Sequence, residues 1–233
     1  MAQLFALLLV IACGGISAEA AESVAPCGPN LPPSKLSVYD AKTRISEEVV
    51  TAAKLADLRN SVRGHSGEHF LLADTAVRGW LTIEHRIAPS ASDPRLFCNA
   101  PARVHLALGY GSTRIFVQPT VAKDDCVMTA LRGHQAEHTH AENEELGSFI
   151  DGQTSLLKRI MTELKATPAT SADAAKAQFE TAGRELVREL ERRLLARKEE
   201  LRRVVDTPAA LARLADACGG RVGAFRDGSG GTI

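Results

Sequence analysis

The chain has 233 residues, of which 45% are hydrophobic and 24% are charged, enough to form one good hydrophobic core. Its 28 Lys and Arg residues balance its 28 Asp and Glu residues, so it lacks the basic excess that drives sequence-independent binding to nucleic acid. Aromatic residues make up only 4% of the chain, which leaves few rings to stack on bases. The composition predicts one folded domain with no nucleic-acid partner.

Residues 1–20 have the pattern of a signal peptide. Residues 4–16 form an apolar run too short to cross a bilayer as a helix, and Ala18-Glu19-Ala20 has the small residues of a cleavage site. We therefore expect a periplasmic or secreted protein, with no transmembrane helix left after cleavage. Alternatively, the segment Val10-Ile11-Ala12-Cys13 resembles a lipobox, which would make the product a lipoprotein anchored through Cys13.

The predicted domain spans residues 36–218 and follows an irregular arm over residues 21–35, which contains four prolines. The part from about residue 36 to residue 121 consists of short alternating or β-branched runs broken by turns, which indicate a small antiparallel sheet. Helical spacing within this part predicts a helix over Ser46–Val62. The predicted strands are Leu36–Asp40, Val77–Ile87 and the two arms of a hairpin, 103–108 and 115–118, around Gly109-Tyr110-Gly111-Ser112.

Residues 125–218 are expected to form a helical hairpin. One helix is predicted over Asp125–Lys165, ended by Pro168, and a second, with an apolar stripe, over Ser171–Val205. Two long helices joined by a short link run antiparallel. Residues 219–233 are rich in glycine and predict a frayed tail. The predicted fold class is α+β, with a small antiparallel sheet followed by a long antiparallel helical hairpin.

Four cysteines remain after signal-peptide removal, and an exported chain favours disulfides over free thiols. Cys126 opens the first predicted helix and Cys218 lies just past the second, so a bond between them would close the open end of the hairpin. The remaining bond, from Cys27 to Cys98, would tie the arm to the sheet. The sequence therefore predicts the disulfides Cys126–Cys218 and Cys27–Cys98.

The segment RGHQAEHTHAENEEL, residues 132–146, concentrates the polar chemistry of the chain. His134 and His138 are four residues apart, so on a helix their rings lie on one face, as two metal ligands require. Glu142 lies about 12 Å from His134 along the helix axis, too far to share an ion. A zinc site would therefore need its third ligand from another segment.

The returning helix is the best source of this ligand. In a hairpin closed by the expected disulfide, facing residues have numbers that add to about 344, which places Asp206 opposite His138. The candidates are Asp206, Glu199 and Glu200, with His105 from the sheet as a further one. A lone histidine on a strand is more often exposed or hydrogen-bonded than a ligand.

The general base of a zinc peptidase is a glutamate beside the ligands. The sequence fits H-x-x-E-H, in which Glu137 is the base, and nearly fits H-E-x-x-H, in which Gln135 replaces the glutamate. Chemistry favours Glu137, because a glutamine side chain cannot accept the proton. The helical wheel favours position 135, which lies on the apolar side of the helix, whereas position 137 lies on the polar side.

The segment IFVQPTVAKDDCVMTALRGHQAEHTHAENEEL, preceded by strands around RGWLTIEH and RVHLAL, resembles a family of bacterial secreted proteins of unknown function that are regarded as zinc-dependent proteases. The resemblance covers about residues 36–205. It implies an HExxH-type zinc peptidase that acts on peptides or proteins, with His134 and His138 as zinc ligands. It does not extend to the base, because Gln135 stands at the position of the family's glutamate.

Three hypotheses follow. The first is an exported zinc metallopeptidase with Glu137 as base. The second is a non-catalytic relative in the cell envelope, in which Gln135 marks the loss of hydrolysis. The third is a helical envelope protein without metal, in which His134 and His138 are ordinary exposed histidines.

Overall fold

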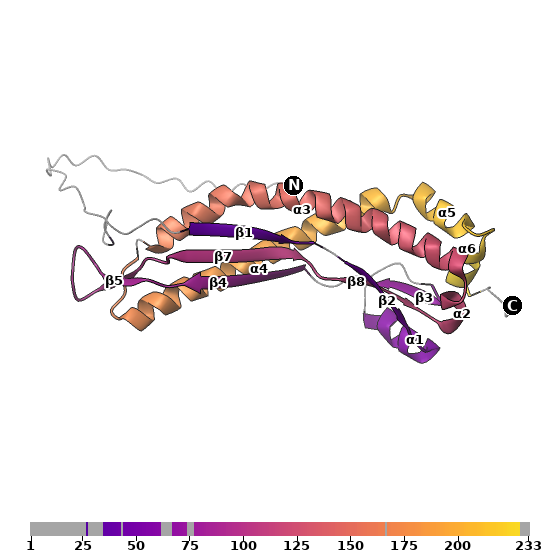
Figure 1. The fold of residues 1–233 in the computed structure, drawn as a ribbon, viewed down its shortest axis with the longest axis horizontal. Coiled ribbons are helices and arrows are strands. Elements are labelled where there is room, and N and C mark those ends of the chain that lie inside the picture. Colours follow the sequence, from indigo (N-terminus) through magenta and orange to yellow (C-terminus); the bar gives the residue numbers. More distant parts are fainter. Residues whose placement is uncertain are drawn as a thin grey trace, which may run out of the picture.

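The computed structural model describes residue 27 and residues 35–42, 44–61, 67–73, 77–165 and 167–228. The expected signal peptide, the alternative anchor at Cys13 and most of the arm lie outside these residues. The fold is a mixed one, with small sheets and two long helices (Figure 1). In chain order the elements are β1 (Lys35–Ala41), β2 (Ile45–Val49), α1 (Ala52–Ser61), β3 (Phe70–Ala73), β4 (Val77–Glu84), β5 (Ile87–Pro89), β6 (Phe97–Asn99), β7 (Arg103–Tyr110), β8 (Thr113–Val117), α2 (Pro119–Ala122), α3 (Asp125–Lys165), α4 (Ala172–Val205), α5 (Pro208–Asp216) and α6 (Arg221–Arg226).

Two three-stranded sheets lie end to end along the long axis of the molecule (Figure 1). In the first sheet β7 pairs in parallel with β1 and antiparallel with β4. In the second sheet β8 pairs in parallel with β2 and antiparallel with β3. Both sheets are therefore mixed, and the prediction of an antiparallel sheet was wrong for them. Alternation of apolar residues indicates which face a strand buries, but it does not give the direction of the neighbouring strand.

The predicted hairpin over residues 103–118 was also wrong. Strands β7 and β8 do not pair with each other, because β7 continues into β8 in the next sheet. Gly109 and Tyr110 of the predicted turn belong to β7 itself. At Gly109 the strands approach so closely that a Cβ atom would clash with the carbonyl oxygen of Ala41. Gly109 therefore serves the contact of β7 with β1 rather than a turn.

The predicted helix over residues 46–62 begins later than expected. Residues Ile45–Val49 form β2, and only Ala52–Ser61 is helical, as α1. The pairing of β2 with β8 accounts for the difference, since a ladder of backbone hydrogen bonds overrides a weak helical spacing. Helix α1 covers the outer face of the second sheet, where Leu55 packs with Leu71 and Phe116.

Both long helices are confirmed at their predicted bounds. The Ser171 hydroxyl accepts a hydrogen bond from the Ala174 amide and caps α4. The helices contact each other, and the first sheet packs against both of them. No helix among the described residues is long and apolar enough to cross a membrane.

On the side of the sheets that α3 and α4 cover, the core consists of two apolar clusters. One cluster lies between the second sheet and the start of α3, with Leu131 at its end. The other lies between the first sheet and the α3–α4 pair, and its first residue on α3 is Leu146. The α3 segment between Leu131 and Leu146 therefore crosses the junction of the two sheets, and its buried side chains there are polar. These are His134, Gln135, His138 and Glu142.

Both predicted disulfides, Cys27–Cys98 and Cys126–Cys218, are confirmed. The first joins the arm to β6, and the second joins the start of α3 to the segment between α5 and α6. Such bonds fit an extracellular or periplasmic protein. The fold extends beyond residue 218, since Val222 of α6 is 1% exposed and packs in the core, so a frayed tail from residue 219 was wrong for this part. Residues 229–233 lie outside the described residues.

Candidate metal centre

The two histidines of the HQAEH segment lie on the buried face of α3. Relative exposure is 6% for His134 and 7% for His138, and the Nε2 atoms of the two rings are 3.3 Å apart. The i, i+4 spacing explains this, because residues one turn apart on a helix lie on the same face. The histidines are therefore buried partners, unlike the exposed histidines of the third hypothesis.

Asp206 reaches this pair from the end of α4. It is the C-terminal cap of α4, and its amide donates a hydrogen bond to the carbonyl of Arg202. Thr207 and Pro208 then start α5, so the chain turns directly after Asp206. The Asp206 Oδ1 atom lies 3.2 Å from the His134 Nε2 atom and 2.9 Å from the His138 Nε2 atom.

The three side chains converge on one point. Zinc with bond lengths of about 2.0 to 2.1 Å has ligand atoms about 3.3 to 3.4 Å apart at the corners of its tetrahedron. The separations here, 2.9, 3.2 and 3.3 Å, are close to this spacing. Within the described residues, no other His, Cys, Asp or Glu side chains form such a group. The buried group of His134, His138 and Asp206 can bind a metal ion.

The electrostatics suit a cation. Burial lowers the pKa of His138 below its ordinary value, and the attraction of the Asp206 carboxylate opposes this shift without reversing it. His138 is therefore neutral at neutral pH, which is the form that ligates metals. Asp206 directs a carboxylate oxygen at both rings, and its side chain is only 10% exposed.

The structure places Gln135 and Glu137 on opposite sides of the helix. Gln135 is buried, at 5% exposure, whereas the Glu137 side chain is 63% exposed. The Glu137 Oε2 atom lies 3.9 Å from the Nδ1 atom of His134, on the side of the ring away from Asp206. Glu137 therefore lies beyond hydrogen-bond distance of His134 on the exposed side of the helix, whereas Gln135 lies on the buried side.

The other candidate ligands lie elsewhere. Glu199 pairs with Arg202 and Glu200 pairs with Arg197. His105 stacks on the Tyr39 ring in the first sheet. Of the acids expected on the returning helix, Asp206 is the one that meets the histidines.

A second buried polar group, which was not expected from the sequence, lies next to this site. Glu142 and Lys198 are each 2% exposed, and the Oε1 and Nζ atoms are 3.6 Å apart. Lys198 could have been found from its spacing, since it continues the buried series Leu190 and Leu194 at the next i+4 position of α4. A lysine at a core position of an apolar stripe signals a buried partner.

Comparison of the chain with protein-family models, with curated proteins and with solved structures found no match. The function must therefore be inferred from the side chains of the metal centre and their surroundings.

Proposed function

We propose that the chain is an exported zinc-binding protein whose ligands are His134, His138 and Asp206. The convergence of two imidazole nitrogens and one carboxylate oxygen within 3.3 Å of one another is the observation that carries the proposal. Zinc is the metal that best suits this donor set, because it accepts imidazole and carboxylate ligands in a tetrahedron. The signal-peptide pattern and the two disulfides support a periplasmic or secreted location, with anchoring through Cys13 as the alternative.

Metal binding without hydrolysis is the favoured form of this function. A hydrolytic zinc site needs a base beside the zinc-bound water. Gln135 is buried on the side of the helix where the H-E-x-x-H pattern has its glutamate, and an amide cannot take the proton. Glu137 can take a proton, but it is exposed and lies at the outer nitrogen of His134. The protein would then act in the envelope as a binding or structural module.

Hydrolysis of a peptide or protein substrate is the second candidate, and the number of ligands favours it. Three protein ligands are typical of catalytic zinc sites, which keep the fourth position for water, whereas structural sites use four. Zinc would lower the pKa of that water and supply the nucleophile. His134, His138 and Asp206 would hold the ion, and Glu137 would have to act as base.

Zinc content of the purified mature protein tests the metal assignment. Hydrogen bonds would give similar distances between these three atoms in a protein without metal, so the assignment requires a measurement of bound zinc. We expect about one zinc per chain after dialysis, and loss of this zinc in His134→Ala. The matched control is His140→Ala, which removes an exposed histidine of the same helix. Zinc-free wild type, or equal zinc in both variants, would reject the site.

A hydrolysis assay separates the two candidates. Wild type, Gln135→Glu and Glu137→Gln are each loaded with zinc and incubated with a peptide library, and cleavage is read by mass spectrometry. Metal binding without hydrolysis predicts no cleavage by wild type. Cleavage by wild type that is lost in Glu137→Gln would instead establish the peptidase with Glu137 as base. Cleavage by Gln135→Glu alone would identify Gln135 as the residue that removed activity.

A further inference from the structure

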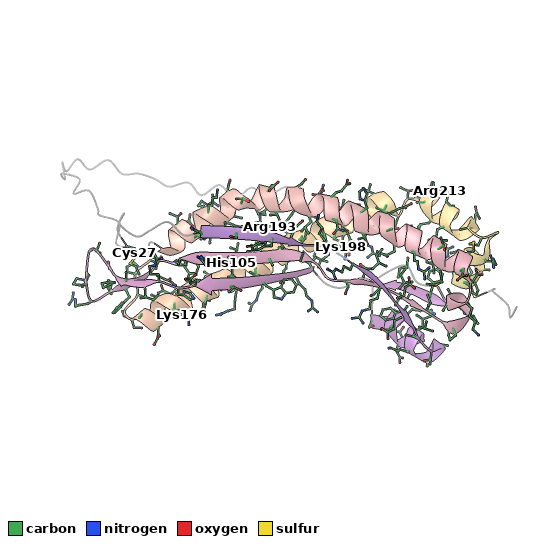
Figure 2. The ribbon with its side chains drawn as sticks, viewed as in Figure 1. Cys27, His105, Lys176, Arg193, Lys198 and Arg213 are labelled. Carbon is green, nitrogen blue, oxygen red and sulfur yellow. A yellow bond between two sulfur atoms is a disulfide. The ribbon has the colours of Figure 1, made fainter. Side chains whose placement is uncertain are left out.

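Glu142 and Lys198 form a buried ion pair between α3 and α4. Each residue is 2% exposed, and the Lys198 Nζ atom lies 3.6 Å from Glu142 Oε1. The Nζ atom also lies 5.3 Å from the centre of the Tyr110 ring, at the end of β7, so a cation–π contact joins the pair to the sheet. Figure 2 shows Lys198 where the two sheets meet. The pair lies in the same polar segment of the interface as the metal centre.

Stability does not explain a buried ion pair. Removing two charges from water costs several kcal/mol per ion, and apolar residues of similar volume often stabilise a protein as well or better. The residues around this pair are already suited to an apolar contact, since Leu146, Leu190 and Leu194 pack in the adjoining cluster. A buried pair can instead select one arrangement of two helices, because every other arrangement leaves a charge without its partner.

The position of the pair relates it to the metal centre. Glu142 lies eight residues after His134 on α3, and Lys198 lies eight residues before Asp206 on α4. The contact of His134 with Asp206 and the contact of Glu142 with Lys198 therefore occur in one register of the antiparallel helices. The register that brings Glu142 to Lys198 therefore also brings His134 to Asp206.

Other registers would break both contacts. A slip of one helical turn moves α4 by about 5.4 Å along α3. It would place Lys198 against either Leu146 or His138 and leave Glu142 without its lysine. The leucines that α4 gives to the neighbouring cluster distinguish these registers poorly, because Leu186, Leu190 and Leu194 repeat one turn apart. The charged pair therefore supplies the discrimination that the apolar contacts lack.

We propose that Glu142 and Lys198 are positioning residues that set the register of α3 and α4, and thereby bring Asp206 to His134 and His138. Their role is to exclude the slipped arrangements, in which the aspartate would lie a turn away from the histidines. The consequence for zinc rests on the proposed function, whereas the register itself does not.

The test replaces the pair by apolar residues, in Glu142→Leu/Lys198→Met. Nitroxide labels on cysteines introduced at the exposed positions Asp151 and Arg203 report the register as a distance measured by pulsed electron resonance. In the wild-type background we expect one narrow distance. In the apolar variant we expect a second distance that differs by about 5 Å, one helical turn. Zinc affinity, measured by competition with a chromophoric chelator, is expected to fall at least tenfold.

Two further variants make the test specific. Glu145→Gln/Arg197→Met removes an exposed ion pair, 2.7 Å long, that joins the same two helices one turn away. It is expected to leave both the distance and the zinc affinity unchanged. Glu142→Lys/Lys198→Glu keeps a pair of opposite charges in the same layer, and it too is expected to keep the single distance.

A single wild-type distance in Glu142→Leu/Lys198→Met would overturn the register role, whatever its zinc affinity. A second distance in Glu142→Lys/Lys198→Glu would overturn it as well, and so would a second distance in the control Glu145→Gln/Arg197→Met. These two variants still test the register role if the apolar variant does not fold. If wild type binds no zinc but the variants give the expected distances, the proposed function is rejected and the register role stands.

Discussion

The contact between α3 and α4 contains two buried polar layers, the metal layer of His134, His138 and Asp206 and the ion-pair layer of Glu142 and Lys198. The layers are two helical turns apart and come from the same two helices. In the ion-pair layer a cation from the chain already faces the carboxylate. In the metal layer the carboxylate faces two imidazoles, one of which has a pKa lowered by burial. The chain thus provides its own cation in one layer and a binding group for a cation in the other.

The two layers show that buried polar side chains between the same two helices can have different roles. A lysine and a glutamate satisfy each other and leave no place for an ion, whereas three electron-pair donors at mutual distances near 3 Å share one point. The ion pair is sensitive to the loss of either partner, because the other charge remains buried. The metal layer is sensitive to the loss of donors. Loss of one partner of the ion pair should therefore act mainly on the unfolding free energy, and loss of a donor in the metal layer should act mainly on metal affinity.

The largest effect on folding is expected for Lys198→Met. The variant leaves Glu142 buried without its cation, which typically costs about 3 to 5 kcal/mol of unfolding free energy. Urea unfolding followed by circular dichroism measures this loss. The double variant Glu142→Leu/Lys198→Met should recover most of it, because no charge is then buried. Equal instability of the single and double variants would mean that the pair contributes by packing alone.

The largest effect on the metal is expected for Asp206→Asn. The substitution keeps the size of the side chain but removes the negative charge and the anionic ligand, so zinc affinity should fall at least about a hundredfold, or about 2.8 kcal/mol. Isothermal titration measures this change. The unfolding free energy of the metal-free protein should change far less than in Lys198→Met. Unchanged affinity in Asp206→Asn would remove the aspartate from the ligand set.

The smallest effect is expected for an exposed ion pair near the site. Glu47 of β2 accepts hydrogen bonds from the Arg132 guanidinium, two residues before His134, with one N···O distance of 2.8 Å. The Arg132 hydrogen bond lowers the pKa of Glu47 below 4.5, against a smaller opposing effect of burial. Because the folded pKa is the lower one, the stabilisation is present above pH 4.5 and is lost as the pH falls through the lowered value. Solvent screening limits it to less than about 1 kcal/mol.

Glu47→Gln tests this exposed pair against the buried one. Unfolding free energies at pH 7 and pH 3 should differ less in the variant than in wild type, by no more than about 1 kcal/mol. A loss at pH 7 as large as that of Lys198→Met would show that exposure does not separate the two kinds of pair.

Much of the helical half could be predicted from the sequence. The bounds Asp125–Lys165 and the location of His134 and His138 on one helical face follow from local periodicity, which neighbours in the fold do not alter. The sequence also predicts a cap at Thr170 or Ser171, and Ser171 is the residue that forms it. The estimated register placed Asp206 opposite His138, and the two are in contact. The observed contacts extend one turn beyond this predicted pairing, since Asp206 also meets His134.

The sheet half could be predicted less well. Local spacing predicts a helix start at β2 and a hairpin at β7 and β8, whereas the true partners of these strands lie far along the chain. Spacing within a short segment cannot reveal whether residue 47 will pair with residue 115. Such long-range pairing is decided when the sheet forms, and it overrides local preference.

By itself the sequence determined the two helices, the two disulfides and the presence of two histidines on one helical face. Each depends on residues close together in the chain or on the chemistry of cysteine in an exported protein. Only the tertiary structure decided that Asp206 completes the group and that Glu142 and Lys198 lie beside it. These contacts join residues more than fifty positions apart, and their distances depend on the register in which two long helices pack.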